Sequence, residues 1–173
     1  MNTSISDRQI KELFNNKANV YSYDEIYKHR SINSLLNPYG FCIILYIWED
    51  RPSYNGHWVY LGYNNKNDTL IFFDSLGNDD EDLLDKVDRP VSIRTHQSYP
   101  YLSNLINESK IYCEYNPKQL QQSHSAVCAR YSCYIARNIH KYKNLFDFVN
   151  NNFTNDRKKN DEIILHLTQN YFN

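Results

Sequence analysis

The sequence has no surplus of positive charge and no long apolar run. Nineteen Lys and Arg residues stand against 20 Asp and Glu residues, so the formal net charge of the 173-residue chain is -1. Proteins that bind nucleic acid or an anionic membrane through charge carry a basic surplus, and the basic clusters here, such as residues 157–159, are small. The longest strictly apolar stretch, residues 41–48, is far shorter than the ~20 residues that span a bilayer. We therefore expect neither nucleic acid nor a membrane as a partner.

Cysteine patterns typical of disulfide frameworks and zinc sites are also missing. Residues 1–6 lack the basic-then-apolar pattern of a secretory signal, so we expect a protein of a reducing compartment that is not secreted. No CxxC pair occurs among the four cysteines, Cys42, Cys113, Cys128 and Cys133. The last two lie five positions apart, which places them on different faces of a helix. We expect no disulfide framework and no metal.

Aromatic and apolar residues are abundant. Hydrophobic residues make up 41% of the chain and aromatic residues 15%, including 16 tyrosines, although the mean hydropathy is -0.72. Disordered chains carry far less ring surface, so this chain should fold. Its length suits one domain, and no repeat, linker or low-complexity block divides it. We expect a single domain over residues 1–173, with an N-terminal helical cover (1–39) ahead of a core (40–173).

Three consecutive segments have the composition of β-strands. Residues 41–48, 57–63 and 69–74 are rich in Ile, Val, Tyr and Phe and are bounded by turn-forming residues. The connections between them are short, which predicts consecutive strands of one sheet. A short strand is also expected at 90–95, and another at 111–115, where the pattern alternates.

Helical spacing of apolar residues occurs in the remaining segments. The first forty residues contain short N-capped helical patterns before the Pro-Tyr-Gly break at 38–40, and the acidic residues 79–82 form a loop or a helix cap. Further helices are expected at 100–106, from Cys128 to about residue 142, at 145–153 and at 163–171, with a polar stretch at 154–160 before the last one.

Two titratable residues occupy strand ends that a hairpin would bring together. Alternation along residues 57–63 places His57 on the core-facing side of its strand, at the entrance, and Asp74 follows at the exit of the next strand. If the strands pair around residues 64–68, the near end of one lies beside the far end of the other. The Asp74 carboxylate could then accept a hydrogen bond from the imidazole of His57.

The same chain supplies the other parts of a nucleophilic-cysteine site. Such a site needs a thiolate, a base, a group that orients the base, and a donor for the oxyanion. Cys128 is expected at a helix start, where free backbone N–H groups and the helix dipole lower the pKa of a thiol. His57 and Asp74 would act as base and orienting group. A side-chain amide from Gln121 or Gln122 would donate to the oxyanion together with the backbone N–H of the cysteine.

Each of these residues also has an ordinary structural interpretation. Cysteine is among the most buried residue types, so Cys128 could belong to the core. A histidine beside tryptophan at a strand start is usually structural, Asp74 could only initiate an Asx turn, and the glutamines at 121–122 could lie on the surface. His124 precedes the thiol by four residues, but its serine neighbours indicate a loop.

Three motifs occur in a particular order: Gly-His-Trp-Val at 56–59, Phe-Phe-Asp-Ser-Leu-Gly at 72–77, and Gln-x3-Ser-x2-Cys at 121–128. This order resembles that of the adenain-like cysteine endopeptidases of double-stranded DNA viruses, which are relatives of the SUMO-specific proteases. The resemblance runs over about residues 41–142, and the size and the Asn and Tyr bias are similar to those of virophage capsid-maturation proteases. It implies an α+β fold with a mixed central sheet flanked by helices, a papain-like site, and a catalytic core at 40–173.

The resemblance also assigns roles to residues. It implies that Cys128 is the nucleophile, His57 the general base and then the general acid, Asp74 the residue that orients His57, and Gln121 the oxyanion donor. Gln122 lies six residues before the cysteine, the spacing of the SUMO-protease branch, whereas Gln121 lies seven before it, as in the adenain branch. We prefer Gln121.

Two neighbours of these residues can be compared with the family pattern. Trp58 matches a family tryptophan that packs near the catalytic site. Ala129 departs from the pattern, because the family usually has glycine directly after the cysteine. The added methyl is tolerable if this residue is helical, since alanine favours helix over glycine by ~0.8–1.0 kcal/mol.

The implied function is a viral cysteine endopeptidase that cleaves capsid or core precursors during virion maturation. Relatives favour small residues such as Gly before the scissile bond, because the substrate lies in a narrow cleft. By the same resemblance, the protein would act in the virion and in the virus factory of the host cell. We expect a monomer without a cofactor, and whether it needs an activating peptide, as relatives from adenovirus do, stays open.

Other functions remain open on the sequence alone. The same residues could serve an isopeptidase that acts on host ubiquitin or SUMO conjugates, and the same fold hosts acetyltransferases that use the cysteine as an acyl carrier. The chain could also be a non-catalytic virion structural protein with a vestigial site. The intact set of His57, Asp74, Gln121 and Cys128 argues against that last alternative.

Overall fold

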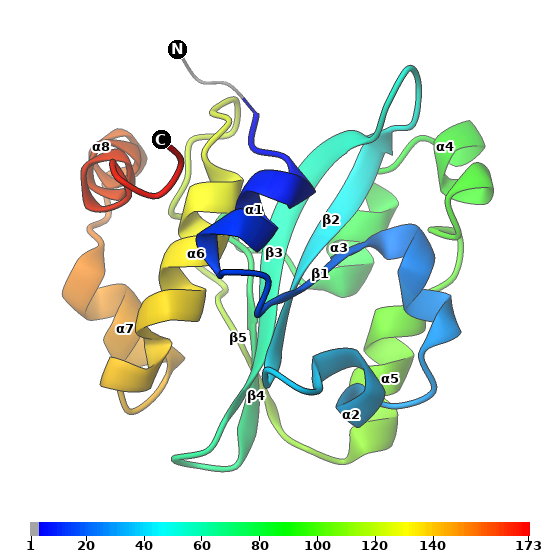
Figure 1. Ribbon diagram of the computed structural model, residues 1–173, viewed down its shortest axis with the longest axis horizontal. Helices are drawn as coiled ribbons and strands as arrows, with labels where there is room; N and C mark the ends of the chain where they lie inside the picture. Colours follow the sequence, from blue (N-terminus) through cyan, green and yellow to red (C-terminus); the bar gives the residue numbers. More distant parts are fainter. Residues whose placement is uncertain (1–3) are drawn as a thin grey trace.

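A mixed five-stranded sheet forms the centre of the computed structural model, which describes residues 4–173 (Figure 1). Residues 1–3, the start of the predicted N-terminal cover, lie outside the described residues. The strands follow one another across the sheet in chain order: β1 (Asn19–Ser22), β2 (Phe41–Glu49), β3 (Asn55–Asn64), β4 (Thr69–Phe73) and β5 (Cys113–Tyr115).

Helices cover both faces of this sheet (Figure 1). One group comprises η1 (Tyr23–Lys28), α2 (Ile32–Leu36), α3 (Asp80–Asp85) and α5 (Tyr101–Ser109). The other comprises α1 (Asp7–Leu13), α6 (Cys128–Asn138), η2 (Ile139–Lys141), α7 (Leu145–Asn152) and α8 (Arg157–Leu167). Helix α4 (Arg89–Arg94) contacts β2 and packs Val91 against the cluster on the α6 side. The predicted α+β class, a mixed sheet flanked by helices, is confirmed. Within residues 4–173, no helix combines the length and the hydropathy needed to cross a membrane.

The predicted hairpin is confirmed by the strand register. β3 pairs antiparallel with β4, with Asn64 opposite Thr69 and Tyr60 opposite Phe73. β2 pairs antiparallel with β3, whereas the outer strands β1 and β5 run parallel to their neighbours. Because the β3–β4 turn is short and Phe73 pairs with Tyr60, the residue that follows β4 lies near the first half of β3, which contains His57.

Both faces of β3 are buried, and the predicted alternation holds. Val59 and Leu61 pack into the core beneath η1, α2 and α5, whereas Trp58 and Tyr60 pack into clusters on the α6 side. β2 has buried residues on both faces as well, which explains why it reads as a continuous apolar run rather than an alternating one.

The strand predicted at 90–95 is wrong, because this segment forms helix α4. Pro90 lies in the first turn of the helix, where its fixed φ fits and its missing N–H removes no hydrogen bond. Ile93 is 60% exposed, so its β-branched side chain does not pack in the core as that of a buried strand would. The last helix also begins earlier than predicted, at Arg157 inside the polar stretch, where the Asp156 side chain caps it by accepting from the Lys159 N–H.

The N-terminal cover is not wholly helical. The predicted short helices are present as α1, η1 and α2, but residues Asn19–Ser22 form β1, which pairs in parallel with β2. Such a short strand, between two capped helical segments, lacks an alternating pattern long enough to detect. The cover therefore contributes an edge strand to the sheet as well as helices.

Helix α7 supplies a matched pair for testing the core. Phe148 is fully buried among Phe73, Tyr142 and Phe153, whereas Phe146 on the same helix is 73% exposed. Phe148→Ala should lower the free energy of unfolding by about 3–5 kcal/mol, since it removes a buried ring and leaves a cavity. Phe146→Ala should change it by less than about 0.5 kcal/mol. Equal losses in urea unfolding would contradict this packing.

Candidate active site

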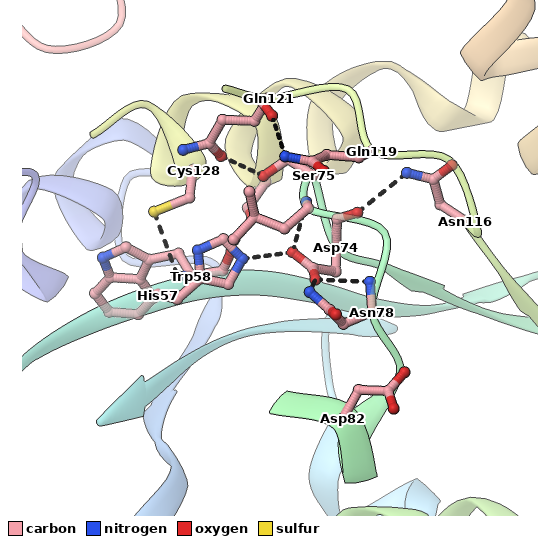
Figure 2. Close-up of polar contacts among 12 residues, drawn as sticks. His57, Trp58, Asp74, Ser75, Asn78, Asp82, Asn116, Gln119, Gln121 and Cys128 are labelled. Atoms are coloured by element: carbon pink, nitrogen blue, oxygen red, sulfur yellow. Dashed lines mark hydrogen bonds and ion pairs between the residues drawn. The ribbon is translucent and has the colours of Figure 1, made fainter. Parts of the chain in front are cut away.

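The structure brings His57, Asp74 and Cys128 together from three elements. His57 lies near the start of β3, Asp74 follows the last residue of β4, and Cys128 is the first residue of α6, which packs on β3. His57 Nε2 is hydrogen-bonded to Asp74 Oδ1 (Figure 2). The backbone N–H of Trp58 donates to Cys128 Sγ at 3.5 Å.

The imidazole of His57 lies between the carboxylate and the thiol. Since Nε2 is engaged by Asp74, Nδ1 is the ring nitrogen on the side that faces Cys128 (Figure 2). All three side chains are buried, with 2% of His57, 0% of Asp74 and 8% of Cys128 exposed. Water is therefore a weak competitor for the interactions among them.

Both oxygens of the Asp74 carboxylate are satisfied. The Leu76 N–H donates to Oδ1 at 3.0 Å, and the backbone N–H and side-chain amide of Asn78 donate to Oδ2 at 2.9 and 3.0 Å. Asp74 thus does initiate an Asx turn, and it binds His57 as well. Burial raises the pKa of Asp74, but the charge and hydrogen bond of His57 outweigh burial and lower it, so the carboxylate stays ionised.

Charge coupling shifts the pKa values of His57 and Cys128 in opposite directions. Burial alone lowers the pKa of His57, but the negative charges of Asp74 and Cys128 outweigh it and raise the pKa to about 10. Burial raises the pKa of Cys128, whereas the His57 charge and hydrogen bonding from His57, Trp58 and Ala129 lower it below the usual 9.0. The two shifts stabilise the thiolate–imidazolium form of the pair relative to two isolated buried side chains.

The other cysteines lack these partners. Burial raises the pKa of Cys42 and of Cys133 well above the ordinary value, and it raises that of Cys113 to about 11. Cys42 lies inside β2, and Cys133 is fully buried on α6. Cys128 alone among the four has a lowered pKa.

A cavity of about 870 Å³ opens beside the thiol. His57, Trp58, Gln121 and Cys128 are among its lining residues, so the site is accessible to a ligand from one side. His124 lies on the loop ahead of α6 and also lines the cavity, in agreement with its predicted loop position.

The two candidate glutamines point to different places. Gln121 is buried and lines the cavity, with its Nε2 donating to the Ser125 carbonyl oxygen at 2.7 Å. Gln122 instead donates through its backbone N–H and its Nε2 to Asp161 of α8, at 3.3 and 3.1 Å. Of the two side-chain amides, only that of Gln121 lies beside the cavity.

Ala129 is the second residue of α6 and is 2% exposed. Its helical position meets the condition under which the methyl group was expected to be tolerated. Trp58 lies beside the site, with its indole N–H donating to the Ile5 carbonyl oxygen at 3.1 Å. The N-terminal segment therefore forms part of the cavity wall.

Sequence reasoning missed several residues around the site. The ring of Trp48 stacks on that of His57, with centroids 5.4 Å apart and planes at 5°. Asn78 holds the Asp74 carboxylate, and Asn116 Nδ2 donates to the Asp74 backbone carbonyl at 3.1 Å. Only the antiparallel pairing of β2 with β3 could have suggested Trp48, and nothing in the sequence marks the asparagines. Within residues 4–173, no group of three or more His, Cys, Asp or Glu side chains is arranged to hold a metal ion.

Residues 15–171 match the model of the family described as the Ulp1 protease family, C-terminal catalytic domain. The chain belongs to this family. It is 28% identical over 147 residues to "Uncharacterized protein V9" of Sputnik virophage, across 84% of this chain and 81% of that protein. The expected relationship to adenain-like and SUMO-specific proteases is confirmed, and the chain is a cysteine protease of this family.

One solved structure shows a similar fold, and a second aligns more weakly. The ASFV pS273R protease aligns with a TM-score of 0.57 and 12% identity, covering all of this chain and 69% of that one. The SUMO protease Ulp1, solved with its catalytic cysteine oxidised to a sulfonic acid, aligns with a TM-score of 0.40 and 14% identity, covering 97% of this chain and 79% of that one.

The lowered pKa of Cys128 predicts how the thiol reacts with iodoacetamide. Because the thiolate is the reactive form, the alkylation rate should rise with pH through a midpoint below 9.0 in the wild-type protein. His57→Ala removes the neighbouring positive charge but not the burial, so the midpoint should move upward. His124→Ala, at the cavity rim, is the matched control and should leave the midpoint in place. A midpoint that is the same with and without His57 would contradict the coupling.

Proposed function

We propose that the chain is a viral cysteine endopeptidase with Cys128 as nucleophile, His57 as general base and acid, Asp74 as the orienting carboxylate and Gln121 as oxyanion donor. The observation that carries this proposal is the buried His57 ring, bonded to Asp74 on one side and facing Cys128 on the other, at the wall of an open cavity. The membership of the Ulp1 protease family supports the same reaction class.

Each group has a defined step in acyl transfer. The Cys128 thiolate attacks the carbonyl carbon of a peptide bond, and the new oxyanion accepts hydrogen bonds from the Gln121 amide and the Cys128 backbone N–H. His57 transfers its Nδ1 proton to the leaving amine as the C–N bond breaks, which leaves a thioester on Cys128. His57 then takes a proton from water, the resulting hydroxide attacks the thioester, and the acid product leaves with the thiolate restored.

We propose capsid or core precursors as the substrates, with cleavage after small residues such as Gly during virion maturation. The similarity to a virophage protein supports a viral setting. The virion and the virus factory of the host cell are where such precursors occur. The proposal includes a monomeric enzyme without a metal or cofactor, and it leaves open whether an activating peptide is needed.

Co-expression with the candidate capsid precursor tests this function. The wild-type protein should release a new precursor terminus that follows a small residue, as read by mass spectrometry. Cys128→Ala should abolish that cleavage because it removes the nucleophile. Cys113→Ala is the control, because the pKa of Cys113 is raised rather than lowered, and it should retain cleavage. Unchanged cleavage by Cys128→Ala would rule out the assignment.

Substrate preference distinguishes the isopeptidase alternative from a protease that cleaves precursors. Fluorogenic ubiquitin and SUMO substrates should be poorer than a peptide that spans the precursor cleavage site. Preference for either conjugate over that peptide would replace precursor processing with deconjugation while keeping the same catalytic residues.

A further inference from the structure

Ser75 directly follows Asp74 in the chain and lies between Asp74 and Gln121. Its hydroxyl donates to Gln121 Oε1 at 2.6 Å (Figure 2). Ser75 is 1% exposed and Gln121 is 2% exposed, so water does not compete for this hydrogen bond. No step of the proposed reaction uses the Ser75 hydroxyl itself.

The hydrogen bonds fix which end of the Gln121 amide is which. The Ser125 carbonyl oxygen can only accept, so the end of the amide that lies 2.7 Å from it must be Nε2. The opposite end is then Oε1, which accepts the hydrogen bond from the Ser75 hydroxyl. One N–H of Nε2 is bonded to Ser125, and the other is left as a donor. If the amide turned over, it would present an acceptor where an oxyanion develops.

The backbone of Ser75 also binds the chain segment that leads into Gln121. The Ser75 carbonyl oxygen accepts from the Leu120 N–H at 2.8 Å and from the Gln121 N–H at 3.0 Å. The two chain segments can approach this closely because Gly77, with φ of +79°, has no Cβ. A Cβ there would lie 2.9 Å from the backbone of Lys118 and of Gln119.

We propose that Ser75 is a positioning residue that sets the direction of the Gln121 amide and so keeps a donor available for the oxyanion. This inference rests on the proposed function of the site. Two adjacent residues then divide the work: Asp74 orients the base, and Ser75 orients the oxyanion donor. The turn that follows β4 is the shared support for both.

Turnover of a fluorogenic peptide that ends in Gly-Gly-aminomethylcoumarin tests the proposal. Ser75→Ala should lower kcat about 10-fold with little change in KM, as expected for the loss of one buried hydrogen bond that matters in the transition state. When Gln121 is already replaced by Ala, adding Ser75→Ala should lower kcat by less than about two-fold, because both changes remove the same function. Ser75→Cys keeps the shape of the side chain, with a slightly larger volume, and a weak donor, so its kcat should lie between wild type and Ser75→Ala.

Alkylation by iodoacetamide separates a positioning role of Ser75 from a general structural role. Only a general disturbance of the site should change the alkylation rate of Cys128. This reaction forms no oxyanion, so Ser75→Ala should leave the Cys128 alkylation rate and its pH midpoint unchanged, as read by peptide mapping. A fall in alkylation that parallels the fall in kcat, or losses that multiply with Gln121→Ala, would overturn the proposal. If Ser75→Ala does not fold, the same comparisons with Ser75→Cys decide.

The failure of this inference differs from that of the proposed function. Full turnover by Cys128→Ala or Gln121→Ala would overturn the reaction assignment and this inference with it. Loss of turnover in both of those variants, together with wild-type kcat in Ser75→Ala, would overturn the role of Ser75 alone.

Discussion

The site depends on a negative charge held in a place that water does not reach. The carboxylate of Asp74 is fully buried, and an ionised group in that position is stable only when charges and donors replace its lost hydration. Leu76 and Asn78 supply the donors, and His57 supplies the opposite charge. The imidazolium that results is what lowers the pKa of Cys128 against the effect of burial. Removing the carboxylate would therefore affect the pKa values of His57 and Cys128 together.

The parts of this arrangement that lie on regular elements could be predicted from the sequence. Alternation along β3 and the short turn before β4 place His57 and Asp74 at one end of a hairpin, because register follows from turn length and from which face is buried. The apolar stripe that begins at Cys128 predicts a helix whose first residue carries the thiol. The choice of Gln121 over Gln122 came from family spacing, and only the contact of Gln122 with Asp161 shows where the second amide lies.

The remaining parts depend on contacts between distant segments, which local pattern does not encode. The strand Asn19–Ser22 exists because it pairs with β2, and its four residues carry no signal alone. Helix α4 is a different case: its Val91 and Ile93 are β-branched, as in a strand, but Pro90 in the first turn and the exposure of Ile93 fit a helix. Ser75 and Asn78 look like ordinary turn residues, and their partners are visible only after folding.

The protonation state of His57 at neutral pH tests the buried charge pair most directly. In a ¹⁵N-labelled protein, the ring nitrogens of His57 should both carry protons at neutral pH and titrate near the raised pKa of about 10. In Asp74→Asn, the pKa of the ring should fall and its neutral fraction at the same pH should rise, because the larger of the two charges that stabilise the imidazolium is gone. A wild-type ring that titrates at the ordinary 6.5, or one that Asp74→Asn leaves unaltered, would contradict the charge coupling on which the site depends.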